Sequence, residues 1–244
     1  MAAGPGVNLS IERMDFAGGA PLYDGLHLRV APGEVLALIG ASGVGKTTIL
    51  RIIGGMETGF AGSVTVGGVP ALAAPVPGFV FQDARLLPWL TVAQNIRAVS
   101  PDLSAAQIAH LLAQVGLAGL EAAYPHQLSG GMQRRLGLAR AISVNPGLLL
   151  LDEPFVSLDR VVVKELQALF NRIFSEVRPT VILVSHDPDD AARLADRVVI
   201  LAGRPARVAA DFRLSDGARR TDRSALDVAQ LVDRIEGAGQ GGEP

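Results

Sequence analysis

Short apolar runs and helical periodicity alternate along the chain. Five runs of three to five apolar residues have the length of strands that are buried on both faces of a sheet. Residues 26–30 and, more weakly, 63–66 alternate apolar and polar positions as half-buried strands do, and apolar residues recur at helical spacing through residues 162–177. This alternation of strands and helices predicts an α/β fold with a mostly parallel sheet. The five apolar runs are residues 35–39, 79–81, 148–151, 181–184 and 198–201.

The stretch between residues 83 and 145 has a residue pattern typical of helices. Ser104 and Gln107 form the pattern of a capping box, and a second helix is predicted from about Ser129 through Arg140. Because this stretch separates two core strands, we expect it to form an inserted α-helical subdomain. The expected division of the single domain is a core of about residues 7–82 and 147–205, a helical subdomain of about 83–146, a short extension of 206–236 and a disordered tail of 237–244.

Composition narrows the class of protein. The 244 residues are 49% hydrophobic and 19% charged, which suits one large domain with a substantial core and excludes a disordered chain. No cysteine occurs, so disulfides, thiolate zinc sites and cysteine nucleophiles are excluded, in keeping with a reducing compartment. A net charge of −2 provides no general basic field for nucleic acid. We expect neither a secretory signal nor a membrane-spanning segment.

Residues 40–47 read GASGVGKT and follow the buried run 35–39. Their spacing matches the phosphate-binding loop G-x-x-x-x-G-K-[ST], in which glycines let backbone N–H groups surround phosphate oxygens at the start of a helix. Lys46 is expected to reach the β- and γ-phosphates, and Thr47 to ligate Mg²⁺. Lys46 is one of only two lysines beside twenty arginines, so a compact ammonium is retained here against the composition of the chain.

Polar residues follow three other buried runs. Asp152 and Glu153 end one run, Gln82 ends another, and His186 lies just beyond a third. The carboxyl ends of parallel strands meet at one edge of a sheet, where ligands bind. Asp152 is therefore expected to hold Mg²⁺, and Glu153 to polarise an attacking water. Gln82 and His186, taken alone, fit an ordinary loop or core position as well as a functional one.

Residues 128–133 read LSGGMQ at the predicted start of a helix. A serine hydroxyl and free backbone N–H groups at a helix N-terminus form a second possible anion site. Since the chain already has one phosphate-binding loop, a second site indicates that two copies meet head to tail, each closing the nucleotide of the other. The alternative is an ordinary capped helix N-terminus.

Taken in order, these motifs resemble the ATP-binding cassette (ABC) ATPases over about residues 7–205. The resemblance implies a RecA-like P-loop NTPase fold with an N-terminal antiparallel β part and an inserted helical subdomain. It also implies ATP hydrolysis by a dimer that encloses two ATP molecules, each with Mg²⁺. The residues implied to hold ATP are Gly40, Ser42, Gly43, Gly45, Lys46, Thr47 and Thr48 from one protomer and Ser129, Gly130 and Gly131 from the other.

The resemblance also assigns chemical roles. Phe16 lies where family members stack an aromatic ring on adenine, although the family more often has Tyr, and Tyr23 is a weaker candidate for that contact. Where the family often reads PFSALD, residues 154–159 read PFVSLD and retain the aspartate that is used chemically. The implied roles are Mg²⁺ ligands for Thr47, Gln82 and Asp152, catalytic base for Glu153, and Q-loop, D-loop and switch residues for Gln82, Asp159 and His186.

One segment narrows the resemblance within the family. Residues 81–89 resemble the segment after the Q-loop in nitrate/sulfonate/taurine-type importers, as residues 219–223 do more loosely. This implies a peripheral ATPase on the cytoplasmic face of the inner membrane that works with permease subunits, a second cassette (expected to be identical) and a substrate-binding protein, to import a small anion or an organosulfur or nitrogen solute. Trp89 suits an interface with the permease and a place inside the helical subdomain equally well.

Two other functions stay open. An exporter or lipid-trafficking ATPase would keep the same cassette, and a soluble P-loop kinase would keep only the phosphate-binding loop. A kinase leaves residues 128–133 unexplained, and the guanine-specific N-K-x-D motif of GTPases is absent.

Overall fold

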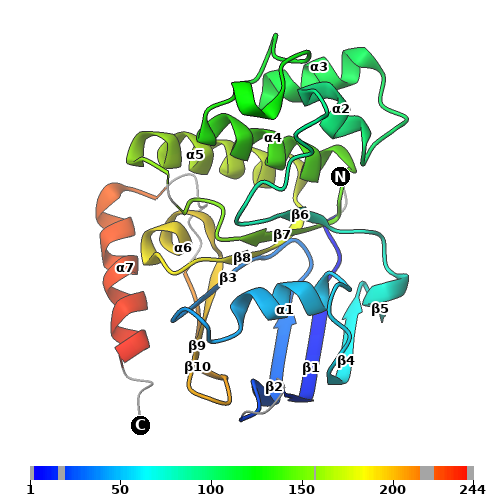
Figure 1. Cartoon of the computed structure of the whole chain (residues 1–244). Coiled ribbons are helices and arrows are strands. Elements are labelled where there is room, and N and C mark those ends of the chain that lie inside the picture. Colours follow the sequence, from blue (N-terminus) through cyan, green and yellow to red (C-terminus); the bar gives the residue numbers. More distant parts are fainter. Residues whose placement is uncertain (1–2, 16–19, 157, 215–222, 241–244) are drawn as a thin grey trace.

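The computed structural model describes residues 3–15, 20–156, 158–214 and 223–240. The strands are β1 (Val7–Met14), β2 (Tyr23–Val30), β3 (Val35–Gly40), β4 (Ala61–Val66), β5 (Val69–Pro70), β6 (Gly78–Val80), β7 (Leu148–Asp152), β8 (Thr180–Val184), β9 (Arg197–Ala202) and β10 (Arg207–Arg213). The α-helices are α1 (Lys46–Ile53), α2 (Val92–Arg97), α3 (Ala105–Gln114), α4 (Gly130–Ser143), α5 (Arg160–Val177), α6 (Pro188–Leu194) and α7 (Ala225–Gln240), and η1 (Ala71–Ala73) and η2 (Pro125–Gln127) are 3₁₀ turns. Strands and helices alternate regularly from β7 to β9, whereas three strands open the chain and α2, α3 and α4 follow one another (Figure 1).

The larger sheet is almost entirely parallel. Its strand order is β10-β9-β3-β8-β7-β6, and only β10 runs antiparallel to its neighbour. Alternate residues of the central strands enter two different cores: Leu149 and Leu151 pack with α2 to α5, whereas Leu148 and Leu150 pack with α1 and the smaller sheet. Burial on both faces explains why these strands read as uninterrupted apolar runs, and the predicted fold class is confirmed.

A smaller antiparallel sheet is formed mainly by the N-terminal part of the chain. Its strand order is β2-β1-β4-β5, with β1 hydrogen-bonded to both β2 and β4. Every second residue of β1 from Val7 to Ile11 is buried, as expected of a strand with one face on the core. Figure 1 shows this sheet beside α1, on the opposite side of the larger sheet from α5.

Helices α2, α3 and α4 form a layer over the larger sheet, opposite the smaller one (Figure 1). Ser104 and Gln107 make the predicted capping box, and Thr91 and Gln94 make a second one at α2. The apolar residues of this layer belong to the same hydrophobic core as β7 and α5, so the helical layer packs directly on the larger sheet.

The C-terminal part of the chain is more ordered than the sequence predicts. α7 packs against α6, β9 and β10, with Val228 and Ile235 in a core that also contains Ile39. The helix includes residues 237–240, so the prediction of a disordered tail beginning at residue 237 is wrong for these four positions. The apolar positions 228, 231, 232 and 235 form a stripe at helical spacing that holds the helix in place despite its glycines. Residues 241–244 lie outside the described residues.

None of the helices within the described ranges is both long and apolar enough to cross a membrane.

Candidate nucleotide site

Two glycines let the loop between β3 and α1 pack closely against neighbouring strands. At Gly40 a Cβ atom would lie 2.4 Å from the carbonyl oxygen of Leu201 in β9, and at Gly45, with φ of 112°, it would lie 2.4 Å from the hydroxyl oxygen of Tyr23. Only glycine fits these two positions. The loop therefore lies tightly against the sheet and turns directly into α1, whose N-terminus favours an anion.

Lys46 folds back over this loop. Its buried Nζ donates hydrogen bonds to the carbonyl oxygens of Gly40 (2.7 Å) and Ala41 (3.0 Å). Burial lowers the pKa of the Lys46 ammonium, while the charges of Glu153 and Asp152 act in the opposite direction. A buried ammonium whose partners are neutral carbonyls is well placed to exchange them for phosphate oxygens.

Thr47 and Asp152 meet at the ends of α1 and β7. The Thr47 hydroxyl donates to Asp152 Oδ1 at 2.8 Å. Burial raises the pKa of the Asp152 carboxyl, and the hydrogen bond from Thr47 opposes that shift. A hydroxyl and a carboxylate in contact are oxygen donors of the kind that Mg²⁺ prefers, and Mg²⁺ commonly takes its remaining ligands from water and from substrate phosphates. The two side chains fit the expected metal position.

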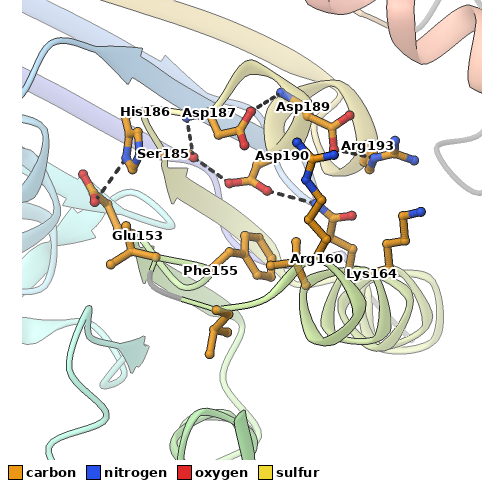
Figure 2. Close-up of a pocket in the computed structure, with 14 residues that line it drawn as sticks. Glu153, Phe155, Arg160, Lys164, Ser185, His186, Asp187, Asp189, Asp190 and Arg193 are labelled. Carbon is orange, nitrogen blue, oxygen red and sulfur yellow. Dashed lines mark hydrogen bonds and ion pairs between the residues drawn. The ribbon is translucent and has the colours of Figure 1, made fainter. Parts of the chain in front are cut away.

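Glu153 and His186 lie side by side at the ends of β7 and β8 (Figure 2). Glu153 Oε2 is 3.3 Å from His186 Nδ1. The Glu153 backbone N–H donates to the carbonyl oxygen of Val184 (3.0 Å), and the residue has a φ of 44°. This left-handed conformation costs a non-glycine residue roughly 1–2 kcal/mol, and such strain is often found at functional positions. The pairing of parallel strands thus brings together two residues that are 33 positions apart.

A cavity of about 420 Å³ lies between the phosphate-binding loop, Gln82 and Glu153. The residues Leu22, Ser42, Gly43, Gly45, Lys46, Thr47, Thr48, Gln82 and Glu153 line it. Gln82, whose role the sequence alone left open, therefore lies with the phosphate-binding loop and the expected catalytic base.

Two arginines of α4 hold the segment that contains Gln82, and sequence analysis did not single them out. Arg134 donates to the main-chain oxygens of Gln82 and Val156, and Arg140 donates to those of Ala84 (2.8 Å) and Arg85 (2.9 Å). Their partners are carbonyl groups, most of them more than 50 positions away, so no pattern of residue types along the chain points to these contacts. The arginines tie the helical layer directly to the nucleotide site.

The residues Ser129, Gly130 and Gly131 at the start of α4 lie apart from the cavity around Lys46. Ser129 caps the helix by accepting a hydrogen bond from the backbone N–H of Met132 (3.3 Å). Ser129, Gly130 and Gly131 are not among the described residues that line the cavity around Lys46. Asp159 caps α5 in the same manner, accepting from Val161 and Val162 at 3.0 Å. One chain alone does not bring these residues to its own phosphate-binding loop.

Of the two aromatic residues considered for adenine stacking, the structure describes only Tyr23. Phe16 lies outside the described residues. Tyr23 is fully buried, and its hydroxyl donates to the carbonyl oxygen of Gly45 at 2.5 Å. A ring without exposed surface offers no face to a base, so Tyr23 is not available for stacking.

A second cavity, of about 590 Å³, is lined by Glu153, His186 and residues of α5 and α6 (Figure 2). The buried Asp190 at this cavity accepts hydrogen bonds from the Ser185 hydroxyl (2.7 Å) and from Gln167 Nε2 (2.9 Å). The Ser185 hydroxyl also accepts from the Asp187 backbone N–H at 3.0 Å. This network fixes the turn that carries His186.

Comparison with known proteins places the chain in a family. A family model described as "ABC transporter" matches residues 23–156. The aliphatic sulfonates import ATP-binding protein SsuB 1 of Xanthomonas axonopodis pv. citri (strain 306) is 43% identical over 232 residues, which cover 92% of this chain and 91% of that protein. A protein of the same name from Pseudomonas aeruginosa (strain UCBPP-PA14) is 41% identical over 222 residues, 88% of this chain and 89% of the relative.

A solved structure agrees in fold. The dimeric post-hydrolysis state of the ATP-binding cassette MJ0796, bound to ADP and Pi, superposes with a TM-score of 0.75 at 26% identity, covering 86% of this chain and 99% of that one. The resemblance inferred from the order of the motifs and the expectation of ATP hydrolysis are thereby confirmed. The chain belongs to the ABC transporter family and is an ATP-hydrolysing cassette of that family.

Proposed function

We propose that this chain is the peripheral ATPase subunit of a membrane importer for aliphatic sulfonates or a closely related small organic anion. The observation that carries the proposal is the match, at 43% identity and over about nine tenths of both chains, to a relative named as an aliphatic sulfonate import subunit. Such relatives argue against the exporter or lipid-trafficking alternative, and family membership argues against a soluble kinase. The expected location is the cytoplasmic face of the inner membrane.

The residues of the nucleotide site are proposed to have three roles: binding the phosphates, holding Mg²⁺ and activating the attacking water. The phosphates are bound by Lys46 and by the other predicted residues of the loop, which are Gly40, Ser42, Gly43, Gly45, Thr47 and Thr48. Thr47 and Asp152, joined at 2.8 Å, would hold Mg²⁺ together with Gln82, and the bound ion would neutralise charge on the phosphate oxygens. Glu153 orients and deprotonates the attacking water, while His186, 3.3 Å from it, contacts the γ-phosphate.

The separation of Ser129 from the cavity supports a site shared between two chains. Ser129, Gly130 and Gly131 lie at an exposed or half-exposed helix N-terminus whose N–H groups suit an anion. We infer that they close the nucleotide of a second, identical protomer, and that Asp159 lies at the same interface. Phe16 remains the proposed stacking partner of adenine. The division into a core of about residues 7–82 and 147–205 and a helical subdomain of about 83–146 is likewise retained as a proposal.

Trp89 supports docking of a permease subunit. Its side chain is 69% exposed, which favours an interface role over packing inside the helical layer. The fully buried Asn95 accepts from the Leu87 N–H (2.8 Å) and donates to the carbonyl oxygens of Leu87, Leu90 and Thr91 at 3.0–3.1 Å. The loop that carries Trp89 is thus held in one shape, and a rigid exposed aromatic side chain is a typical interface anchor.

Transport by the reconstituted complex tests the proposal. The chain, its permease and a substrate-binding protein are placed in vesicles with ATP, and uptake of labelled ethanesulfonate is measured with a second alkanesulfonate, nitrate and sulfate as separate competitors. We expect uptake that requires ATP and is blocked by an alkanesulfonate but not by nitrate. W89A serves as the docking variant: it should retain ATP binding by the isolated chain and lose association with the permease. Uptake of nitrate in preference to sulfonates would contradict the proposed solute.

A further inference from the structure

Tyr23 is the first residue of β2, and its ring lies directly behind the phosphate-binding loop. Its side chain has no exposed surface, and its hydroxyl donates to the carbonyl oxygen of Gly45 at 2.5 Å. Burial raises the pKa of the Tyr23 phenol, while hydrogen bonds with Thr48 and with the backbone of Ile49 oppose that shift. The phenol therefore keeps its proton and remains a donor at physiological pH.

The contact acts on the peptide that joins the loop to α1. In a trans peptide the C=O and the following N–H point in opposite directions. When the Gly45 carbonyl is held inward by the Tyr23 hydroxyl, the Lys46 N–H is held outward. Gly45 O also accepts from Ile49 N at 3.1 Å and so belongs to the first turn of the helix. The hydroxyl thus orients the first turn of α1, whose residues Lys46, Thr47 and Thr48 line the cavity.

Tyr23 and Gly45 fit only as a pair. Gly45 has a φ of 112°, and a Cβ there would lie 2.4 Å from the phenol oxygen. Tyr23 is itself anchored to the larger sheet, because it forms a bridge with Ala206, and Ala206 N donates to Leu22 O at 2.8 Å. The hydroxyl is therefore fixed to the framework of both sheets, which makes it a rigid support for the loop.

We propose that Tyr23 is a positioning residue of the nucleotide site, whose hydroxyl holds the Gly45 carbonyl inward so that the loop presents its N–H groups to the phosphates before nucleotide arrives. The inference rests on the proposed roles of residues 40–48. It assigns to Tyr23 a function that needs no contact with the nucleotide and that differs from aromatic stacking on adenine.

The variant Tyr23→Phe tests the inference, because it removes one oxygen and keeps the ring that fills the core. The dissociation constants of ATP and ADP are measured by calorimetry, together with kcat at saturating ATP. A single hydrogen bond contributes a net factor of about 2 to 10 in an equilibrium constant. We expect both dissociation constants to rise by that factor together, since ATP and ADP share the phosphates that the loop surrounds, while kcat stays within about twofold.

The matched control is Tyr124→Phe, which removes the hydroxyl of the only other tyrosine, a residue that is 40% exposed. It should leave both dissociation constants unchanged. As a second measurement, amide hydrogen exchange of residues 44–50 without nucleotide should be faster in Y23F than in Y124F. A purely structural role would lower the melting temperature of Y23F and leave nucleotide affinity and exchange of the loop unaltered, and that result would overturn the inference. Failure of the wild-type chain to bind ATP would instead overturn the proposed function.

Discussion

Replacement of Asp190 by asparagine should change how the stability of the protein depends on pH. Asp190 is only 5% exposed, and its two carboxylate oxygens accept from Ser185 and Gln167. Burial raises the pKa of this carboxyl from 3.8 to about 6; the charges of Asp187 and Asp189 add to the shift, and the two hydrogen bonds oppose it. The asparagine of the variant would keep the shape of the side chain without its ionisation.

The sign and size of the effect follow from the two pKa values. A folded-state pKa near 6 and an unfolded-state value near 3.8 mean that the folded protein binds this proton more readily. Between about pH 4 and pH 6 the contribution of Asp190 to the free energy of unfolding therefore rises as pH falls. Above pH 6 its buried charge destabilises the fold. A shift of about two pKa units corresponds to at most about 3 kcal/mol. In D190N this contribution is absent.

Urea unfolding between pH 4.5 and pH 7.5, followed by circular dichroism, measures the effect. The free energy of unfolding of the wild type, minus that of D190N, should grow by about 2 kcal/mol between pH 7 and pH 4.5. D189N is the matched control, because Asp189 carries the same charge on the same helix but pairs with Arg193 at the partly exposed surface. Its difference from the wild type should vary little with pH. Parallel curves for D190N and the wild type would refute the reasoning.

Two further predictions concern the nucleotide site. Glu153→Gln removes the proposed base and should lower kcat by roughly 10²- to 10⁴-fold while ATP binding is retained. Glu165→Gln, which removes a carboxylate from an exposed ion pair with Arg135, is the control. Turnover of E153Q within tenfold of wild type would remove Glu153 from the mechanism. Arg134→Gln removes two hydrogen bonds to main-chain oxygens and should lower the free energy of unfolding by about 2 kcal/mol in urea titrations, whereas R135Q should cost under about 1 kcal/mol. Equal losses in the two arginine variants would show that Arg134 contributes no more than a surface pair.

The strands and the chemistry at their ends could be predicted for one physical reason. Strands buried on both faces must be apolar throughout, so their polar end residues are conspicuous, and parallel pairing brings those ends together. Asp152, Glu153 and His186 follow this rule, and the structure brings them to one edge of the sheet. Their chemical roles stay predictions.

Other features depend on contacts that no local pattern encodes. The aromatic ring of Tyr23 suggests adenine stacking, but its burial and its contact with Gly45 arise only when β2 packs behind the loop. The carbonyl partners of Arg134 are distant in sequence, and main-chain atoms carry no residue-specific signal. The end of α7 is not predicted because its glycines read as breaks, although a stripe of apolar residues packs the helix on β9 and α6.

The central claim is that one nucleotide is held by Lys46 of one protomer and Ser129 of another. Two variants, K46A and S129R, are prepared in the E153Q background, and ATP retained after gel filtration with Mg²⁺ is measured for each alone and for an equimolar mixture. Each variant alone damages every shared site, whereas a mixed dimer has one site with both residues intact. The account predicts retained ATP in the mixture and none in either variant alone. A mixture that retains no ATP would contradict it.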